Sequence, residues 1–279
     1  MPRGTRALLP LRRVARRSAT RYAPWALQAR DTRVVLRAVV FDLDGVLLDS
    51  EQLWDAARRS LVQNEGGAWQ DGATEAMLGM SSTEWPRYLR ERLRVPLTEE
   101  RIVDLIVADL LARYRRDLPL LPGAVDAVRR LAAHWPLAVA SSSNRVVIEE
   151  VLDRSGLRGC FDAIVSSEEV AHGKPSPDVY LAATRALGVP ARDCAAVEDS
   201  ANGIRAAAAA RMHVVVVPNS HFPPPEEALA KADLVIATLD ELSIDVLEAM
   251  GGTEARLDEQ GAKSLPASDA GPEGAGPAT

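Results

Sequence analysis

Residues 39–50, with the sequence VVFDLDGVLLDS, join an apolar run to two aspartates, Asp42 and Asp44, that stand two positions apart. The apolar run spans residues 34–41 with one interruption, which is typical of a strand buried on both faces of a parallel sheet. Side chains two residues apart in a strand point the same way, so both carboxylates should project from its carboxyl end, where open α/β sheets bind ligands. Adjacent carboxylates repel each other unless a cation or a shared proton intervenes. The stretch therefore predicts a magnesium site with a carboxylate free for chemistry.

The composition indicates a soluble globular protein with an acidic body. The 279 residues carry a net charge of −6, yet residues 1–33 hold nine arginines and a single acid, so the remainder is strongly acidic. An acidic body argues against nucleic-acid binding, and no stretch approaches the roughly 18 uninterrupted apolar residues of a membrane span. Cys160 and Cys194 lack metal-type spacing and fit a reducing cytoplasm. We expect a cytoplasmic monomer or weak dimer without nucleic-acid or membrane partners.

The chain divides into two tails, a core and an inserted segment. Residues 1–33 permit a targeting segment, a disordered tail or an over-extended start, of which we favour the disordered tail. Residues 251–279 are rich in Gly, Pro, Ala, Ser and acids, and we expect them to be disordered as well. Residues 50–118 show helical spacing without strand signals, so we expect a helical cap inserted into a core formed by residues 34–49 and 119–250.

The core sequence alternates between strand and helix patterns, which predicts a parallel sheet covered on both faces. The expected strands are residues 34–41, 137–140, 161–166, 194–197, 214–217 and 234–236. The expected core helices are residues 123–134, 145–156, 177–187, a helix through 206–210, and 239–249. In the cap, Asp49 or Ser50 can cap a helix ending near Asn64, and Asp49 with Gln52 resembles a capping box. Thr98 can cap a second helix. Asn144 can cap the helix that ends near residue 156.

Polar side chains that suit phosphoryl chemistry follow the predicted strands or begin the predicted helices. Ser141 follows one strand at a helix N-terminus, where free amide groups favour a phosphate. Glu198 and Asp199 follow a later strand and add carboxylates near the first pair, although acids at this place also suit a helix N-terminus. Lys174 stands in a turn and is one of only three lysines beside thirty arginines, so a lysine-specific role is indicated. Together these groups suit a hard cation and a phosphoryl group.

Four segments, FDLDGVLLDSE, ASSSN, GKPSPD and VEDSANGI, resemble the four motifs of the haloacid dehalogenase superfamily, in order and at ordinary spacing. The resemblance covers roughly residues 37–245 and is strongest to the branch with a helical cap after the first strand. That branch includes sugar-phosphate phosphatases, phosphoglycolate phosphatase and β-phosphoglucomutase. The resemblance implies an α/β fold, a Rossmann-like doubly wound parallel sheet with an inserted α-helical cap.

The resemblance also implies a role for each matching residue. Asp42 would be the nucleophile that forms an aspartyl-phosphate, and Asp44 would be the acid/base that protonates the leaving oxygen and then activates water. Mg²⁺ would be held by the Asp42 carboxylate, the Asp44 main-chain carbonyl and Asp199, with Glu198 ligating or organising its waters. The aspartate at position 44 excludes true dehalogenase chemistry, because phosphoryl-transferring members carry an aspartate there.

The remaining predicted site residues bind the substrate, a small phosphorylated metabolite. Ser141 and Lys174 would grip the phosphoryl oxygens and offset developing charge, with Ser142 and Asn144 of the same motif beside them. Trp54 has two interpretations. It stacks on a sugar face at the cap entrance, or it fills the junction between the cap helix and the core.

The resemblance leaves hydrolysis and phosphomutation open, and we favour hydrolysis of a sugar or polyol phosphate. In β-phosphoglucomutase-like sequences a histidine lies ten residues after the acid/base aspartate, whereas this chain has Trp54, as in hexose- or hexitol-phosphate phosphatases. Residues 79–82 read GMSS where such mutases place an arginine, although Arg87 could supply a cation from a shifted position. A non-catalytic binding member is the third alternative, and its expected signature, loss of a core carboxylate, is absent from this sequence.

Overall fold

The computed structural model describes residues 35–78, 80–219 and 221–250. The two predicted tails and Gly79 of the cap loop lie outside these residues. No helix in the described part of the chain combines the length and apolar character needed to cross a bilayer.

A parallel sheet with strand order β3-β2-β1-β4-β5-β6 forms the centre of the described chain. Its strands are β1 (Ala38–Phe41), β2 (Leu137–Ser141), β3 (Ala163–Ser166), β4 (Cys194–Glu198), β5 (His213–Val216) and β6 (Leu234–Val235). The order changes direction between β1 and β4, and ligands bind at this position in sheets of this kind.

Helices cover both faces of the sheet, because alternate strand residues face opposite sides. Val39 and Phe41 of β1 belong to one apolar cluster, and Ala38 and Val40 belong to the other. The first face carries α5 (Ala124–Ala132), α6 (Arg145–Ser155) and α10 (Ile244–Met250). The second carries α7 (Asp178–Leu187), α8 (Ala201–Ala209) and α9 (Glu226–Leu229). The predicted α/β class with a doubly wound parallel sheet is therefore confirmed.

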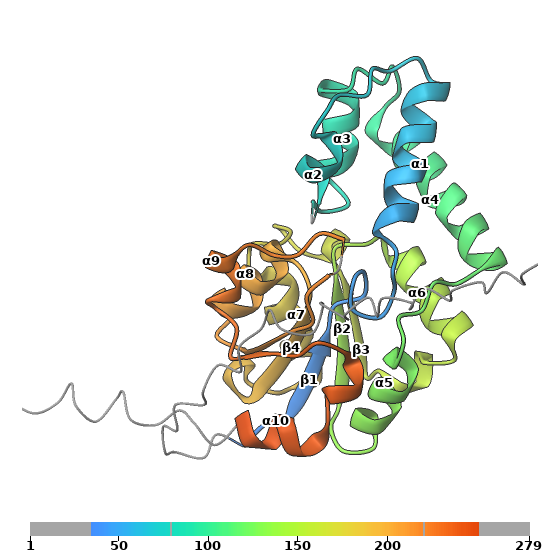
Figure 1. Cartoon of the computed structure of the whole chain (residues 1–279). Helices are drawn as coiled ribbons and strands as arrows, with labels where there is room; N and C mark the ends of the chain where they lie inside the picture. The colour runs from blue at the N-terminus through green and yellow to red at the C-terminus, as the bar shows by residue number, and fades with distance from the viewer. Residues whose placement is uncertain (1–34, 79, 220, 251–279) are drawn as a thin grey trace, which may run out of the picture.

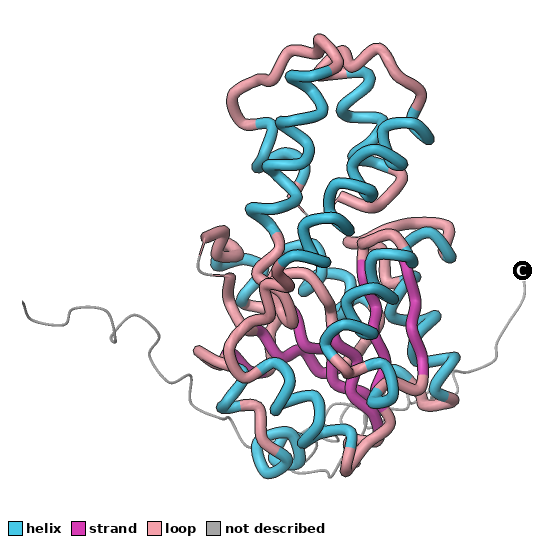
Figure 2. The backbone as a smooth tube through the Cα atoms, turned by 90° about the vertical axis from the view of Figure 1, so that its right-hand side faces the viewer, coloured by secondary structure: helices cyan, strands magenta, loops and turns pink. Residues whose placement is uncertain are grey.

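Further helices stand beyond the carboxyl ends of the strands, as Figures 1 and 2 show. They are α1 (Glu51–Asn64), α2 (Ala73–Met77), α3 (Glu84–Glu91) and α4 (Glu99–Arg116). The Thr98 side chain accepts a hydrogen bond from the Arg101 backbone N–H, which confirms the predicted cap of α4. Of the two predicted caps of α1, Ser50 holds the N-cap position, although its side chain makes no capping bond. The predicted capping box at Asp49 is wrong.

Two elements differ from the sequence prediction by more than two residues or by a break. The first strand begins at Ala38 instead of residue 34, because its neighbours start only there: Ala38 pairs with Cys194 and Val39 pairs with Leu137. The predicted helix over residues 239–249 is instead a 3-10 turn, Leu239–Glu241, followed by α10. The Arg130 guanidinium bonds the carbonyls of residues 239 and 242 at this break.

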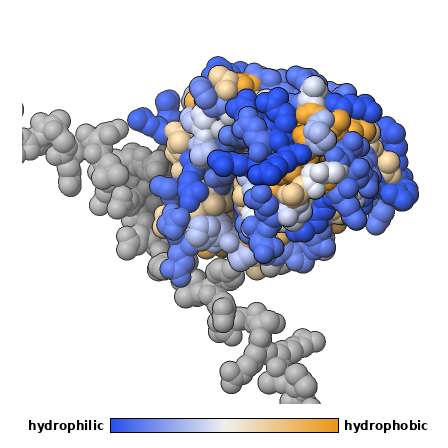
Figure 3. Space-filling view, turned by 90° about the horizontal axis from the view of Figure 1, so that it is seen from above, coloured by the Kyte–Doolittle hydropathy of each residue, from blue (hydrophilic) through white to orange (hydrophobic). Residues whose placement is uncertain are grey.

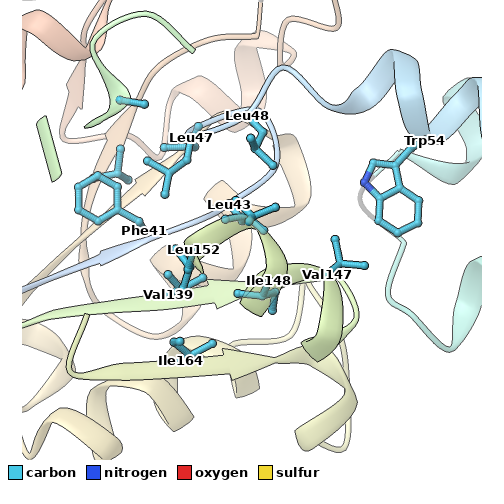
Figure 4. Packing of buried hydrophobic residues seen from close by; sticks show 14 of the residues in the cluster. Phe41, Leu43, Leu47, Leu48, Trp54, Val139, Val147, Ile148, Leu152 and Ile164 are labelled. Atoms are coloured by element: carbon cyan, nitrogen blue, oxygen red, sulfur yellow. The ribbon is translucent and has the colours of Figure 1, made fainter. Parts of the chain in front are cut away.

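Apolar packing continues from the sheet to the helices above it. Figure 4 shows Phe41, Val139 and Ile164 beside one another on the sheet, with Trp54 on α1 and its ring nitrogen turned toward the core. These residues belong to a single buried cluster that also includes Trp85 of α3. Seen from the α1–α4 side, the surface is mostly hydrophilic, with apolar residues gathered in small areas (Figure 3). The shared cluster fixes α1–α4 over the carboxyl ends of the strands.

Candidate active site

The site lies at the carboxyl ends of the adjacent strands β1 and β4. Asp42 directly follows β1, and its backbone N–H donates to the Val197 carbonyl of β4 at 3.0 Å. Asp199 directly follows β4, and Phe41 pairs with Val197 in the register of the two strands. Sequence positions about 150 residues apart therefore meet at one edge of the sheet, as the sequence analysis expected.

Three buried carboxylates form a candidate metal centre. Oxygen atoms of Asp42, Glu198 and Asp199 lie within 4.8 Å of one another. Asn219 fixes the third carboxylate, since its Nδ2 donates to Asp199 Oδ2 at 3.2 Å. Several carboxylate oxygens converging on one point are the donors that Mg²⁺ prefers, so these residues fit the predicted ion.

Lys174 lies between two of these carboxylates. Its Nζ donates to Asp42 Oδ1 at 2.8 Å and to Glu198 Oε1 at 2.6 Å, and the side chain is almost completely buried. Burial works against its charge, but the Asp42 and Glu198 carboxylates together hold the pKa of Lys174 above its ordinary value. The lysine is therefore a fixed positive charge beside the predicted nucleophile.

The carboxylate cluster is electrostatically incomplete, since Lys174 is the one cation bonded to it within the described chain. Burial raises the pKa of Asp42 to about 8; the Lys174 ammonium opposes this rise, and Glu198 and Asp44 add to it. Burial, followed by the Glu198 and Asp42 charges, raises the pKa of Asp199 well above its usual range. Such groups ionise fully near neutral pH only when a further cation neutralises them.

Glu198, the last residue of β4, is fixed by hydrogen bonds from several neighbours. Tyr180 OH donates to Glu198 Oε1 at 2.6 Å, and Ser200 donates to Oε2 from both its backbone N–H and its hydroxyl. Although burial opposes ionisation, Lys174 holds the pKa of Glu198 below its ordinary value. A Cβ on Gly203 would lie 1.7 Å from Glu198 Oε1, so only glycine permits this approach. Ser200, not either acid, caps α8, which removes the helix-cap alternative.

Asp44 is held by three hydrogen-bond donors, two from the start of α1 and one from the segment after β2. Ser50 Oγ donates to Oδ1 at 2.5 Å, and Trp54 Nε1 donates to the same oxygen at 3.1 Å. Ser143 Oγ donates to Oδ2 at 2.6 Å. These bonds fix the carboxylate beside Asp42. Ser50 and Ser143 were not predicted as site residues, although Ser143 lies two positions after Ser141 in the ASSSN segment and so could share its direction.

The predicted substrate-binding residues of the ASSSN segment have different environments. Ser141 is fully buried, and its Oγ accepts from the Ser143 backbone N–H at 3.0 Å. Asn144 is buried and its Nδ2 donates to Glu168 at 2.7 Å. Ser142 instead lines the cavity at the site, and its buried Oγ has no hydrogen-bond partner in the described chain. Ser142 is therefore the hydroxyl in this segment best placed to meet a ligand.

A cavity of about 500 Å³ opens between the sheet edge and α1–α3. The predicted residues that line it are Asp42, Asp44, Trp54, Ser142, Lys174 and Asp199. Ser141, Asn144 and Glu198 are not among its lining residues. Trp54 packs edge-on against Trp85 with ring centroids 6.0 Å apart and donates to Asp44 of the core, which supports the junction interpretation of this tryptophan. Glu51 and Arg58 also line the cavity and were missed, although both follow the helical spacing of Trp54 on α1.

Comparison with known proteins agrees with this geometry. The family model described as haloacid dehalogenase-like hydrolase matches residues 36–211. The chain belongs to this family. This haloacid dehalogenase-like hydrolase is 35% identical to hexitol phosphatase B of Escherichia coli over 74% of the chain and 94% of that protein. It is 31% identical to fructose-1-phosphate phosphatase YqaB of Escherichia coli over 64% of the chain and 95% of that protein.

A solved structure supports the same family assignment. The crystal structure of CbbY from Rhodobacter sphaeroides in complex with phosphate superposes with a TM-score of 0.67 at 30% identity. The match covers 75% of this chain and 96% of that protein. The predicted family is thus confirmed, together with the prediction that the chain is an enzyme with hydrolase chemistry.

Proposed function

We propose that this hydrolase is a Mg²⁺-dependent phosphatase that hydrolyses a small phosphorylated metabolite, a sugar or polyol phosphate. Relatives named as hexitol and fructose-1-phosphate phosphatases support the class of phosphoric monoester hydrolase. The observation that carries the proposal is the pairing of Asp42, bonded to Lys174, with Asp44, bonded by three donors, in one cavity. A nucleophile and a separate acid/base are the two groups that this hydrolysis needs.

In the first step, the Asp42 carboxylate attacks phosphorus and the bond to the leaving oxygen breaks. Asp44 gives that oxygen a proton, and Lys174 and the Ser142 hydroxyl face the phosphoryl oxygens that gain charge. In the second step Asp44 takes a proton from water, which attacks phosphorus and releases Asp42 and phosphate. Asp42, Glu198, Asp199 and the Asp44 main-chain carbonyl are the residues that would hold Mg²⁺. When bound, the ion keeps Asp42 ionised and neutralises phosphoryl charge.

The proposed nucleophile is tested by phosphate release from an aryl phosphate. We expect activity only with Mg²⁺, and Asp42→Asn should lower kcat by at least about a thousandfold, since covalent catalysis would be lost. Asp199→Asn should abolish the Mg²⁺-dependent rise in Tm, which for wild type at saturating ion amounts to a few degrees. Activity of Asp42→Asn near the wild-type level, or full activity in EDTA, contradicts the mechanism.

The alternative of a β-phosphoglucomutase-like phosphomutase is separated by its product. β-Glucose 1-phosphate is incubated with the enzyme, and free phosphate and glucose 6-phosphate are measured. We expect free phosphate, because Trp54 occupies the position of the mutase-type histidine and donates to Asp44. Net isomerisation without free phosphate would establish the mutase instead. A panel of sugar and polyol phosphates with the same readout then ranks the substrates.

A further inference from the structure

Helix α1 turns three side chains toward the cavity. Glu51, Trp54 and Arg58 are spaced three and four residues apart, so they share one helix face, and all three line the cavity with Asp42 and Lys174. Trp54 is engaged with Asp44, and its ring packs against Trp85. Arg58 lies on the same face but has no role in the proposed hydrolysis.

Arg58 is a buried cation without a direct partner among the described residues. Its residue is 7% exposed, its Nε is buried and unbonded, and within the described chain the guanidinium makes no hydrogen bond or ion pair. Its carbon Cζ lies 5.1 Å from the Trp54 ring centre and 5.6 Å from that of Trp85. Two indole faces stabilise the charge in part, but they satisfy none of its N–H donors. Buried arginines are ordinarily paired with an acceptor, so the unpaired guanidinium of Arg58 suits an anionic ligand.

The neighbouring arginine shows that the lack of a partner is specific to Arg58. Arg59 donates to Asp55 Oδ2 at 2.6 Å and to Thr74 at 2.8 Å, and it stacks on Trp69. Thr74 donates to the other oxygen of Asp55 at 2.6 Å, so the acid nearly one turn before Arg58 is fully engaged elsewhere. The fold thus pairs the arginine that faces away from the cavity and leaves the one that lines it unpaired within the described residues.

Resting on the proposed function, we propose that Arg58 binds an anionic group, a carboxylate or second phosphate, at the substrate end remote from the transferred phosphoryl group. The planar guanidinium fork matches these groups with two parallel hydrogen bonds. Lys174 is committed to Asp42 and Glu198 at the phosphoryl end, so Arg58 is the cation available on the cap side of the lining. The preferred substrate is therefore a sugar phosphate with a second anionic group, a carboxylate or a phosphate, in place of a hexitol phosphate whose remote end is uncharged.

Glu51 does not prevent the binding of such an anion. No hydrogen bond or ion pair joins Glu51 to Arg58 in the described structure. Burial raises the pKa of Glu51 to about 7, a rise that Arg58 opposes and Asp44 reinforces. Near neutral pH this carboxyl exists in both forms and can therefore donate to or accept from a substrate hydroxyl. Arg58 and Glu51 together thus suit a substrate that carries both an anionic end and hydroxyl groups.

The test uses two substrates that differ only at the remote end. Sorbitol 6-phosphate and 6-phosphogluconate share six carbons and the phosphate position, but carbon 1 is an alcohol in the first and a carboxylate in the second. We expect wild type to prefer 6-phosphogluconate by about tenfold or more in kcat/KM, as charge-assisted hydrogen bonds imply. Arg58→Gln should bring the ratio near one, and Arg58→Lys should restore part of it. Arg59→Gln is the matched control and should keep the wild-type ratio.

The ratio of the two kcat/KM values does not depend on the fraction of folded enzyme, because a general loss of folding would lower both values equally. Fructose 1,6-bisphosphate and fructose 6-phosphate form a second pair, which tells a second phosphate from a carboxylate. Preference for the member with the additional anionic group in either pair, removed by Arg58→Gln, supports the proposal. Absence of this preference in both pairs, or an unchanged ratio in Arg58→Gln, overturns it.

Calorimetric binding separates this inference from the proposed function. The binding of sorbitol 6-phosphate and of 6-phosphogluconate is measured with Mg²⁺ on two proteins, the Asp42→Asn variant and the Asp42→Asn, Arg58→Gln double variant. These measurements require no turnover. A binding preference of about tenfold for 6-phosphogluconate that disappears with Arg58→Gln supports the role of Arg58 even if no substrate is hydrolysed. Equal binding in the two chains overturns the inference while leaving the aryl-phosphate test of the proposed function unaffected.

Discussion

At the scale of single residues, Asp44 shows how the site distinguishes two aspartates that are two positions apart. Asp42 is bonded by a lysine, whereas Asp44 receives two hydroxyl donors and one indole donor. Ser143 comes from the segment after β2 and Trp54 from α1. Both the sheet core and the helices α1–α4, which form the helical layer, therefore hold the same carboxylate. The proposed acid/base therefore depends on neighbours that are distant in sequence.

Removing the Ser143 hydroxyl tests this arrangement. Ser143→Ala deletes the 2.6 Å bond to Asp44 Oδ2, and hydrogen bonds to charged groups contribute about 1.5–3 kcal/mol. We expect kcat for aryl phosphate hydrolysis to fall roughly tenfold to a hundredfold. Ser155→Ala at the end of α6 is the control, because its hydroxyl bonds only the Leu152 carbonyl. A kcat equal to that of the control contradicts a role for Ser143 in positioning Asp44.

At the scale of elements, α1 serves both folding and the site. Its buried face contributes Ala57, Leu61 and Val62 to the apolar core, and its first two turns present Glu51 and Trp54 to the cavity. The helical spacing that forms the core contact therefore also aligns polar side chains at the cavity. Placing Glu51 there has a cost in stability, because burial disfavours its charged form.

The cost predicts a pH dependence of stability that is specific to Glu51. Its pKa rises from 4.5 in the unfolded chain to about 7 in the fold, so the folded state favours the proton. The stabilising contribution is complete below about pH 4.5 and is lost as the pH rises through 7. Relative to Glu51→Gln, wild type should lose roughly 1–3 kcal/mol of unfolding free energy between pH 4.5 and 8.

Urea denaturation of both chains at several pH values measures this difference. Glu91→Gln, on the exposed surface of α3, removes the same charge without burial and is the control. A difference between wild type and Glu51→Gln that stays constant with pH would show that Glu51 does not titrate with the fold.

At the scale of the whole molecule, the loop before α3 joins the helical layer to the core across the cavity. Ser82 and Ser167 approach with their hydroxyl oxygens 3.0 Å apart, and both are buried. A Cβ on Gly173 would lie 2.5 Å from the Ser81 Cβ, so the loop that carries Lys174 touches the same segment. Ser167 Oγ also donates to the Ser142 carbonyl at 2.9 Å, which links this contact to the ligand-facing segment. These contacts therefore hold the segment before α3 against the core beside the cavity.

Ser82→Ala tests whether this contact holds the helical layer over the cavity. Loss of one buried hydrogen bond weakens the closed arrangement by about 1 kcal/mol, so we expect kcat/KM for a sugar phosphate to fall roughly three- to tenfold. Thr83→Ala is the matched control, since its hydroxyl contacts Ser81 within the same loop. Equal values for the two variants would argue against a closing role for Ser82.

Local sequence patterns were enough to predict the sheet, because apolar strands alternate with helices. They also placed Asp42 and Asp199 after strands and Lys174 in a turn, and parallel topology brings strand ends together. The roles proposed for these residues rest on the family resemblance. The places of Ser141 and Ser142 could not be predicted in this way, because adjacent residues after a strand point to opposite sides. Only the atomic packing shows that Ser142 faces the cavity.

The environment of the cap-side residues, in contrast, became visible only in the folded chain. Arg58 and Arg59 are adjacent arginines that the sequence cannot tell apart, yet one is paired with Asp55 and the other is buried and unpaired among the described residues. Trp54 reaches Asp44 because the helical layer docks over β1, a contact set by packing between distant segments. Local patterns determine which side chains a segment carries, whereas the burial and bonding partners of those side chains depend on the elements that pack around them.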